Sequence, residues 1–116
     1  MANVINVKAA CLWRMGGYHN LQDWLNADAK HVYIGRDMTK YVPGAHRSKW
    51  ANPFPLSQYT RDTCLQMYEE HVRHSYKLWN DLPELEGCVL GCWCAPASCH
   101  GHVLQKLISE RRAALQ

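Results

Sequence analysis

The sequence CVLGCWC occupies residues 88–94, between Gly87 and the pair Ala95-Pro96. The run is short and apolar, which is typical of a parallel strand buried on both faces. Two further segments with apolar character, residues 3–8 and 31–36, are the other strand candidates. We expect these three segments to pair in one sheet.

Helical segments are predicted between and after the strands. Asn20 has the character of an N-cap and predicts a short helix over residues 20–29. Apolar residues recur at helical spacing over 60–81, and a last helix is predicted over 98–114. Residues 11–19, with two adjacent glycines, and the Pro-containing segment 37–58 are predicted loops. This alternation predicts an α/β fold, a small three-layer domain with a short, mostly parallel sheet flanked by helices.

The composition predicts a single α/β domain over residues 1–116, because 47% hydrophobic and 20% charged residues are typical of a globular protein. The sequence has neither an apolar run of membrane-span length nor the start of a secretory signal. Four of the six cysteines fall within residues 88–99. Without a secretory signal, this clustering favours the cytoplasm or another reducing intracellular compartment over secretion, and metal binding or reactivity over disulfides.

Positive charge is concentrated in one region. Residues 30–49 carry a net charge of +4, whereas the whole chain carries +3. Such a patch suits an anionic small molecule or a nucleic-acid backbone as the partner. Small parallel sheets bind ligands beyond the carboxyl ends of their strands, here Gly35-Arg36 and residues 92–94. The basic segment and the cysteine cluster both follow these ends, so we expect one site there.

The cysteine cluster has the pattern C-x-C-x4-C-H-x-H. Three thiolates and one imidazole are a ligand set for tetrahedral zinc, which is the cofactor predicted here. The candidate ligands are Cys92, Cys94, Cys99 and His100, with His102 as the alternative imidazole. On a strand, Cys92 and Cys94 would share one face with their side chains held apart, so both can bind one ion only if the strand breaks at Cys94.

Two other interpretations of the cluster remain open. Cys99 lies where the last helix is predicted to begin, and a helix N-terminus stabilises a thiolate, so Cys99 is a candidate nucleophile or redox centre with His100 as a candidate base. In the inert interpretation, Cys92 and Cys94 only pack at a buried strand end.

Three motifs in order carry a resemblance to a known family. They are VYIGR at residues 32–36, WANPF at 50–54, and LGCWCAP at 90–96 followed by CHG at 99–101. Together they resemble the uncharacterised family called domain of unknown function 4326, in which the second motif more often has Gly at the position of Ala51. The resemblance implies a small α/β domain found in viruses, phages and microbes, and it implies no known reaction.

Three functions are compatible with the sequence. The first is a zinc-stabilised module that binds a nucleotide or nucleic acid. Arg36, Arg47 and Lys49 would contact phosphate in this module. Trp50 would either offer a stacking face or pack in the core beneath the loop, and Asn52 would either contact a base edge or hold the turn before Pro53. The second is a small enzyme that uses Cys99 or His100 on a nucleotide-like substrate. The third is a structural or assembly protein.

Overall fold

The computed structural model describes residues 2–95 and 97–114, so Pro96 of the expected strand break lies outside the described residues. Three strands form the sheet: β1 (Asn3–Asn6), β2 (His31–Tyr33) and β3 (Val89–Cys92). β3 lies in the centre and pairs in parallel with both neighbours, giving the order β1-β3-β2. The predicted parallel sheet is confirmed, and β3 falls within the CVLGCWC segment.

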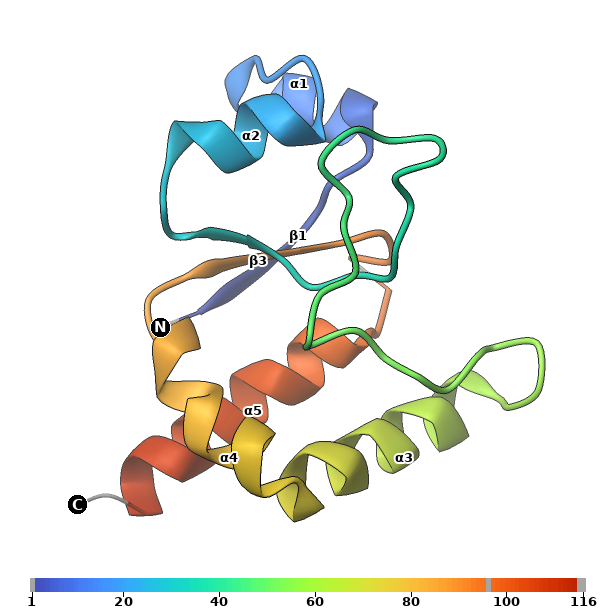
Figure 1. The fold of residues 1–116 in the computed structure, drawn as a ribbon, viewed down its shortest axis with the longest axis vertical. Coiled ribbons are helices and arrows are strands. Elements are labelled where there is room, and N and C mark those ends of the chain that lie inside the picture. The colour runs from blue at the N-terminus through green and yellow to red at the C-terminus, as the bar shows by residue number, and fades with distance from the viewer. Residues whose placement is uncertain (1, 96, 115–116) are drawn as a thin grey trace.

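Helices cover both faces of this sheet (Figure 1). One face carries α1 (Ala9–Gly16) and α2 (Leu21–Ala27). The opposite face carries α3 (Arg61–His74), α4 (Tyr76–Asp81), the 3₁₀ turn η1 (Leu82–Leu85) and α5 (His100–Ala114). The expected three-layer α/β architecture is therefore confirmed. None of the helices in residues 2–95 and 97–114 has the length and apolarity that a membrane span requires.

The apolar core has two parts, one on each face of the sheet. The part beneath α1 and α2 centres on Leu12, Leu21 and Trp24, all of which are fully buried. The larger part beneath α3, α4 and α5 includes Tyr68 and Leu104. Both parts contact β3, because a central parallel strand is buried on both faces.

The N-terminal segment corrects one prediction from the sequence. Residues 9–16 form α1, although residues 11–19 were expected to be a loop because of the adjacent glycines. Gly17 adopts a φ of 73° and its amide donates to the carbonyl of Trp13 over 2.8 Å, while the amide of Tyr18 donates to the carbonyl of Leu12 over 3.4 Å. A left-handed glycine with these bonds is a helix C-cap, so the glycine pair ends a helix here.

The helix predicted over residues 60–81 is broken in two. Ser75 separates α3 from α4, and its Oγ accepts a hydrogen bond from the amide of Leu78. A serine that caps a new helix in this way interrupts the backbone hydrogen bonds of a continuous helix, and the chain changes direction there.

The predicted N-cap at Asn20 is confirmed, since its Oδ1 accepts a hydrogen bond from the amide of Asp23 over 2.8 Å.

The strands end earlier than predicted, at Tyr33 and at Cys92. Residues 37–58 contain no helix or strand, as expected. This long loop lies beside the carboxyl ends of β2 and β3 (Figure 1). Tyr68 of α3 anchors the loop, because its buried hydroxyl donates a hydrogen bond to the carbonyl of Trp50 over 2.6 Å. The loop therefore has a fixed attachment to α3.

Candidate functional site

A cleft of about 330 Å³ lies at the carboxyl ends of β2 and β3. The residues that line it come from both strand ends, the long loop and the start of α5. They are Gly35, Arg36, Asn52, Phe54, Pro55, Leu56, Ser57, Cys92, Trp93, Cys94 and His100. Each of the three sequence motifs contributes residues to this lining. The site is therefore where the strand-end rule predicts it.

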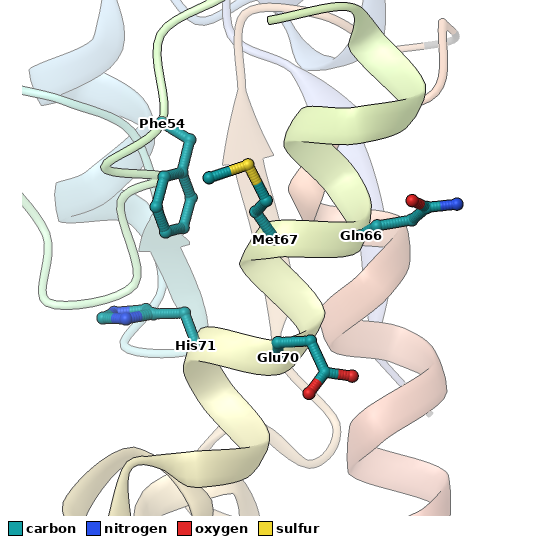
Figure 2. A pocket seen from close by; sticks show the side chains of 5 residues that line it. All are labelled: Phe54, Gln66, Met67, Glu70 and His71. Carbon is teal, nitrogen blue, oxygen red and sulfur yellow. The ribbon is translucent and has the colours of Figure 1, made fainter.

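A second depression, of about 550 Å³, lies on the outer side of α3. Figure 2 shows Phe54 and Met67 next to one another there, with His71 close to Phe54. Glu70 adds a carboxylate to its edge, and Phe54 is its only residue from the three motifs. No lysine or arginine is among the described residues that line this depression. The smaller cleft is the better candidate for an anion site.

Arg36 is the only lysine or arginine in the cleft lining. Within residues 2–95 and 97–114 its guanidinium has no ion-pair or hydrogen-bond partner, because Asp37 bonds Thr39 and Glu86 pairs with Arg112. None of the lining residues is acidic. An unpaired guanidinium in such a lining is free to form a bidentate contact with phosphate or carboxylate.

The backbone of Arg36 is held by two aromatic residues. The hydroxyl of Tyr33 donates to the carbonyl of Arg36 over 2.6 Å and accepts from Nε1 of Trp93 over 2.8 Å. Burial raises the pKa of Tyr33, so its hydroxyl stays protonated and remains a donor. Gly35 is required between them, because a side chain at this position would collide with the Tyr33 hydroxyl.

Asn52 presents an amide to the cleft from the long loop. Its Oδ1 accepts a hydrogen bond from the backbone amide of Phe54 over 2.9 Å, which forms a turn before Pro55. Its Nδ2 has no partner in the described part of the chain. The Oδ1 atom therefore holds the loop turn, and the Nδ2 atom remains a hydrogen-bond donor for a ligand.

His100 begins α5 and packs between strand and helix. Its Nε2 donates to the carbonyl of Ile34 over 2.7 Å, and its ring meets Tyr68 edge to face. Burial lowers the pKa of His100, which favours the neutral imidazole. Because Nε2 carries the proton, Nδ1 has a free lone pair and no partner among the described residues.

Cys92 and Cys99 form a buried pair. Their sulfurs are 3.2 Å apart, within hydrogen-bond distance. The hydrogen bond from Cys99 lowers the pKa of Cys92 to about 6, and the backbone amides of Cys94 and Ala95 add to this effect. The same bond, together with burial, raises the pKa of Cys99. The pKa of Cys92, which lines the cleft, is therefore the lower of the two.

The predicted zinc ligands do not surround a common point. Cys92 and Cys99 contact each other directly, Nε2 of His100 is bonded to the Ile34 carbonyl, and Nδ1 of His102 accepts from the amide of Cys99. Within residues 2–95 and 97–114, no three His, Cys, Asp or Glu side chains are grouped to hold a metal ion. This arrangement does not fit tetrahedral zinc, and zinc binding stays a prediction.

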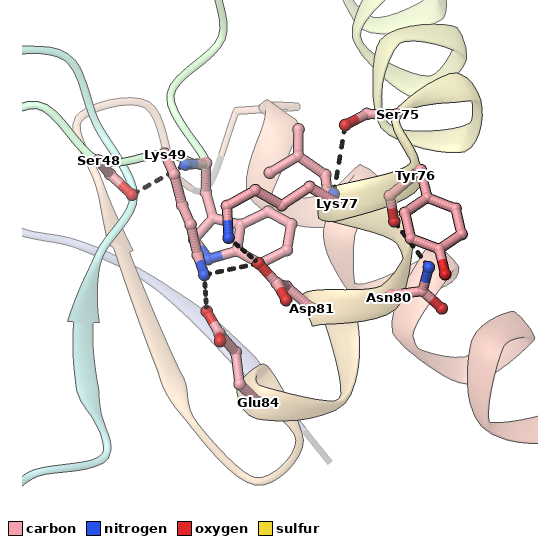
Figure 3. A network of polar contacts seen from close by, with 10 residues as sticks. Ser48, Lys49, Ser75, Tyr76, Lys77, Asn80, Asp81 and Glu84 are labelled. Carbon is pink, nitrogen blue, oxygen red and sulfur yellow. Dashed lines mark hydrogen bonds and ion pairs between the residues drawn. The ribbon is translucent and has the colours of Figure 1, made fainter.

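Two predicted ligand contacts are occupied by the fold itself. Lys49 pairs with Asp81 at 3.0 Å and Glu84 at 2.7 Å, as Figure 3 shows, and it does not line the cleft. Trp50 is 2% exposed, so its ring packs in the core and offers no stacking face. These two residues hold the long loop in place.

Arg47 is exposed and also lies outside the cleft lining. Among the residues singled out from the sequence for ligand binding, only Arg36 and Asn52 line the cleft. Leu56 and Ser57 line the cleft but were not singled out from the sequence. Trp93 lies within the strand end at residues 92–94 to which the strand-end rule points, although no ligand contact was assigned to it.

The comparisons with known proteins connect these motifs to a family. Residues 19–110 match the family described as "Domain of unknown function (DUF4326)". The chain belongs to the DUF4326 family. This match includes all three motifs and every residue that lines the cleft.

One relative of the chain is viral. The chain is 36% identical over 85 residues to "Uncharacterized protein R718" of Acanthamoeba polyphaga mimivirus, covering 66% of this chain and 65% of the relative. The chain therefore spans slightly less than two thirds of that relative's length. No solved structure matches the chain. The expected viral link is confirmed by this relative, whose name assigns no activity.

Proposed function

We propose that the cleft binds a small anionic ligand of the nucleotide class. The observation that carries the proposal is Arg36, an unpaired guanidinium in a lining without a carboxylate. Arg36 is exposed at the cleft, and no carboxylate of the described residues pairs with it, in contrast to Lys49 nearby. A phosphate or carboxylate of a ligand would take this place at Arg36.

The rest of the lining suits the ring of a nucleotide. Trp93 and Phe54 add aromatic surface, and the Trp93 indole is held in one orientation by its bond to Tyr33. Asn52 offers its free Nδ2 as a donor to a ring acceptor. The aromatic surface can contact the face of a nucleotide base, the amide can contact the edge of the base, and the guanidinium can contact the phosphate.

The size of the cleft favours a single nucleotide over a nucleic-acid strand. Its volume of about 330 Å³ is at the small end of the range for ligand pockets, which is roughly 300–1,000 Å³. A nucleic-acid surface would instead need several unpaired cations along a groove. Only one lies in this lining, so a free mononucleotide is the preferred ligand.

The other sequence-based hypotheses stay predictions. A thiol enzyme would use Cys99, the nucleophile predicted from the sequence, or Cys92, which has the lower pKa of the pair and lines the cleft. His100 keeps a free Nδ1 for the role of base. Zinc is not needed for the proposed binding, because Arg36, Asn52 and Trp93 supply all of its contacts.

Isothermal titration calorimetry with a panel of ligands tests the proposal. The panel contains inorganic phosphate, ribose 5-phosphate, four nucleoside 5′-monophosphates, the matching nucleosides and a short single-stranded oligonucleotide. We expect a monophosphate to bind more tightly than phosphate or its nucleoside, since each of these lacks part of the contacts. Equal affinity for nucleoside and monophosphate would contradict the anion contact. Binding of the oligonucleotide alone would contradict the single-nucleotide assignment.

A further inference from the structure

Cys92 and Cys99 are the two cysteines whose sulfurs contact each other, at 3.2 Å. All six cysteines belong to the described residues and carry free thiols. The sulfurs of Cys64 and Cys88 donate instead to the backbone carbonyls of Tyr59 and Glu84. The close sulfur pair therefore has a geometry that the other cysteines lack.

The two residues of the pair are placed differently relative to the cleft. Both are buried, Cys92 at 1% and Cys99 at 2% exposed, but only Cys92 belongs to the lining. Backbone amides are directed at both sulfurs, those of Cys94 and Ala95 at Cys92 and those of Gly101 and His102 at Cys99. Cys92 is therefore the member of the pair next to the cleft, and the Cys99 sulfur lies in contact with it.

From this juxtaposition we propose that Cys92 and Cys99 form a redox-active dithiol that exchanges with low-molecular-weight disulfides entering the cleft. The proposal does not depend on nucleotide binding, because it requires the two sulfurs and not Arg36. It assigns the cysteine cluster a covalent role that differs from metal ligation.

The exchange proceeds in two steps. The Cys92 thiolate attacks one sulfur of the small disulfide, the S–S bond of that molecule breaks, and its other half leaves as a thiolate. Cys99 then loses its proton and attacks the Cys92 sulfur, forming the Cys92–Cys99 bond and releasing the second half. Two protein thiols are oxidised and one small disulfide is reduced to two thiols, with the protons of Cys92 and Cys99 passing to the two leaving thiolates.

The test uses fully reduced full-length protein and oxidised glutathione. Peptide mapping by mass spectrometry is expected to find the Cys92–Cys99 disulfide, with a loss of about 2 Da from the intact chain. Cys99→Ser is expected to stop at one glutathione attached to Cys92, because the resolving thiol is missing. Cys92→Ser is expected to lose this reaction. Cys64→Ser, the matched control at a buried cysteine outside the cleft, is expected to react like the wild type.

Two results would overturn the proposal. One is a wild-type chain whose Cys92 and Cys99 stay reduced, or whose disulfide forms between other cysteines. The other is one zinc per chain, measured by elemental analysis after purification without chelator, that keeps both thiols unreactive until it is removed. Because both results are obtained on the wild-type chain, the proposal can be judged even where a serine variant fails to fold. An Arg36→Ala chain that still forms the disulfide but binds no nucleotide separates this reaction from ligand binding.

Discussion

The hydroxyl of Tyr33 accepts a hydrogen bond from the indole Nε1 of Trp93 over 2.8 Å and thereby joins the ends of β2 and β3. The two rings meet edge to face, with centroids 6.1 Å apart. The same hydroxyl donates to the carbonyl of Arg36. One phenol oxygen on β2 thus connects Trp93, which follows the central strand, with the backbone of Arg36.

Tyr33→Phe tests whether this connection holds the site. The substitution leaves Nε1 of Trp93 and the carbonyl of Arg36 without their partner, which should lower the free energy of unfolding by about 1–2 kcal/mol. Ligand affinity should fall as well, because the backbone of Arg36 is no longer fixed. Urea unfolding and calorimetric titration measure the two effects. Tyr41→Phe, at a tyrosine that is 72% exposed, should change neither. Unchanged affinity in Tyr33→Phe would count against the positioning role.

Tyr68→Phe tests the anchor of the long loop. Tyr68 is fully buried, and its hydroxyl is the donor to the carbonyl of Trp50. Without that donor a buried carbonyl loses its partner, so the free energy of unfolding should fall by about 1–3 kcal/mol. The loop over residues 37–58 should also be cleaved faster by a protease under native conditions. The more exposed Tyr59→Phe is the control, and equal cleavage of the two variants would argue against the anchor.

Glu69 predicts a pH-dependent contribution to stability. Its hydrogen bond to Lys106, and then its bond to Arg73, lower the pKa of the Glu69 carboxyl. A lowered pKa in the folded state means that the ion pairs stabilise the fold above the unfolded pKa, which is about 4.3, and that this contribution is lost as the pH falls through the folded pKa.

We therefore expect Glu69→Gln to lower the free energy of unfolding by about 1 kcal/mol at pH 7 and by less at pH 3. Urea unfolding at both pH values measures this difference. Glu70→Gln is the matched control one residue away, because Glu70 and His74 form an exposed pair with side chains 66% and 77% exposed. Its effect at pH 7 should be smaller. A Glu69→Gln effect of equal size at both pH values would contradict the electrostatic origin.

Much of the fold follows from local sequence signals. The apolar run around Leu90 predicts the central strand, and Asn20 predicts the start of α2. Both signals depend only on residues close by in the sequence. The strand-end rule also places Arg36 and Cys92 in one site. Gly17 and Ser75 carry local signals that can be read in two ways. A glycine pair marks a loop or a helix end, and a serine within a helical pattern can cap a second helix.

The parts that could not be predicted depend on partners far away in the sequence. Core packing of Trp50 is one of the two alternatives that the sequence leaves open, and its burial together with the bond from Tyr68 to its carbonyl decides between them. Lys49 has the character of a ligand contact but pairs with Asp81, 32 residues away. For His100, the spacing of the cysteine cluster does not reveal that Nε2 donates to the Ile34 carbonyl. An aromatic or basic residue can contact a ligand only where it is not already buried in the core or paired with another residue of the chain.

The most direct test of ligand binding compares two arginines. Arg36→Ala and Arg47→Ala remove the same charge from the same basic segment, but only Arg36 lines the cleft. With the nucleoside monophosphate that the wild-type chain binds best, calorimetry should show an affinity at least about tenfold weaker for Arg36→Ala, equal to the loss of a charged hydrogen bond. Arg47→Ala should remain within about twofold of the wild type. Equal losses in both variants, or no loss at Arg36, would contradict the proposed site.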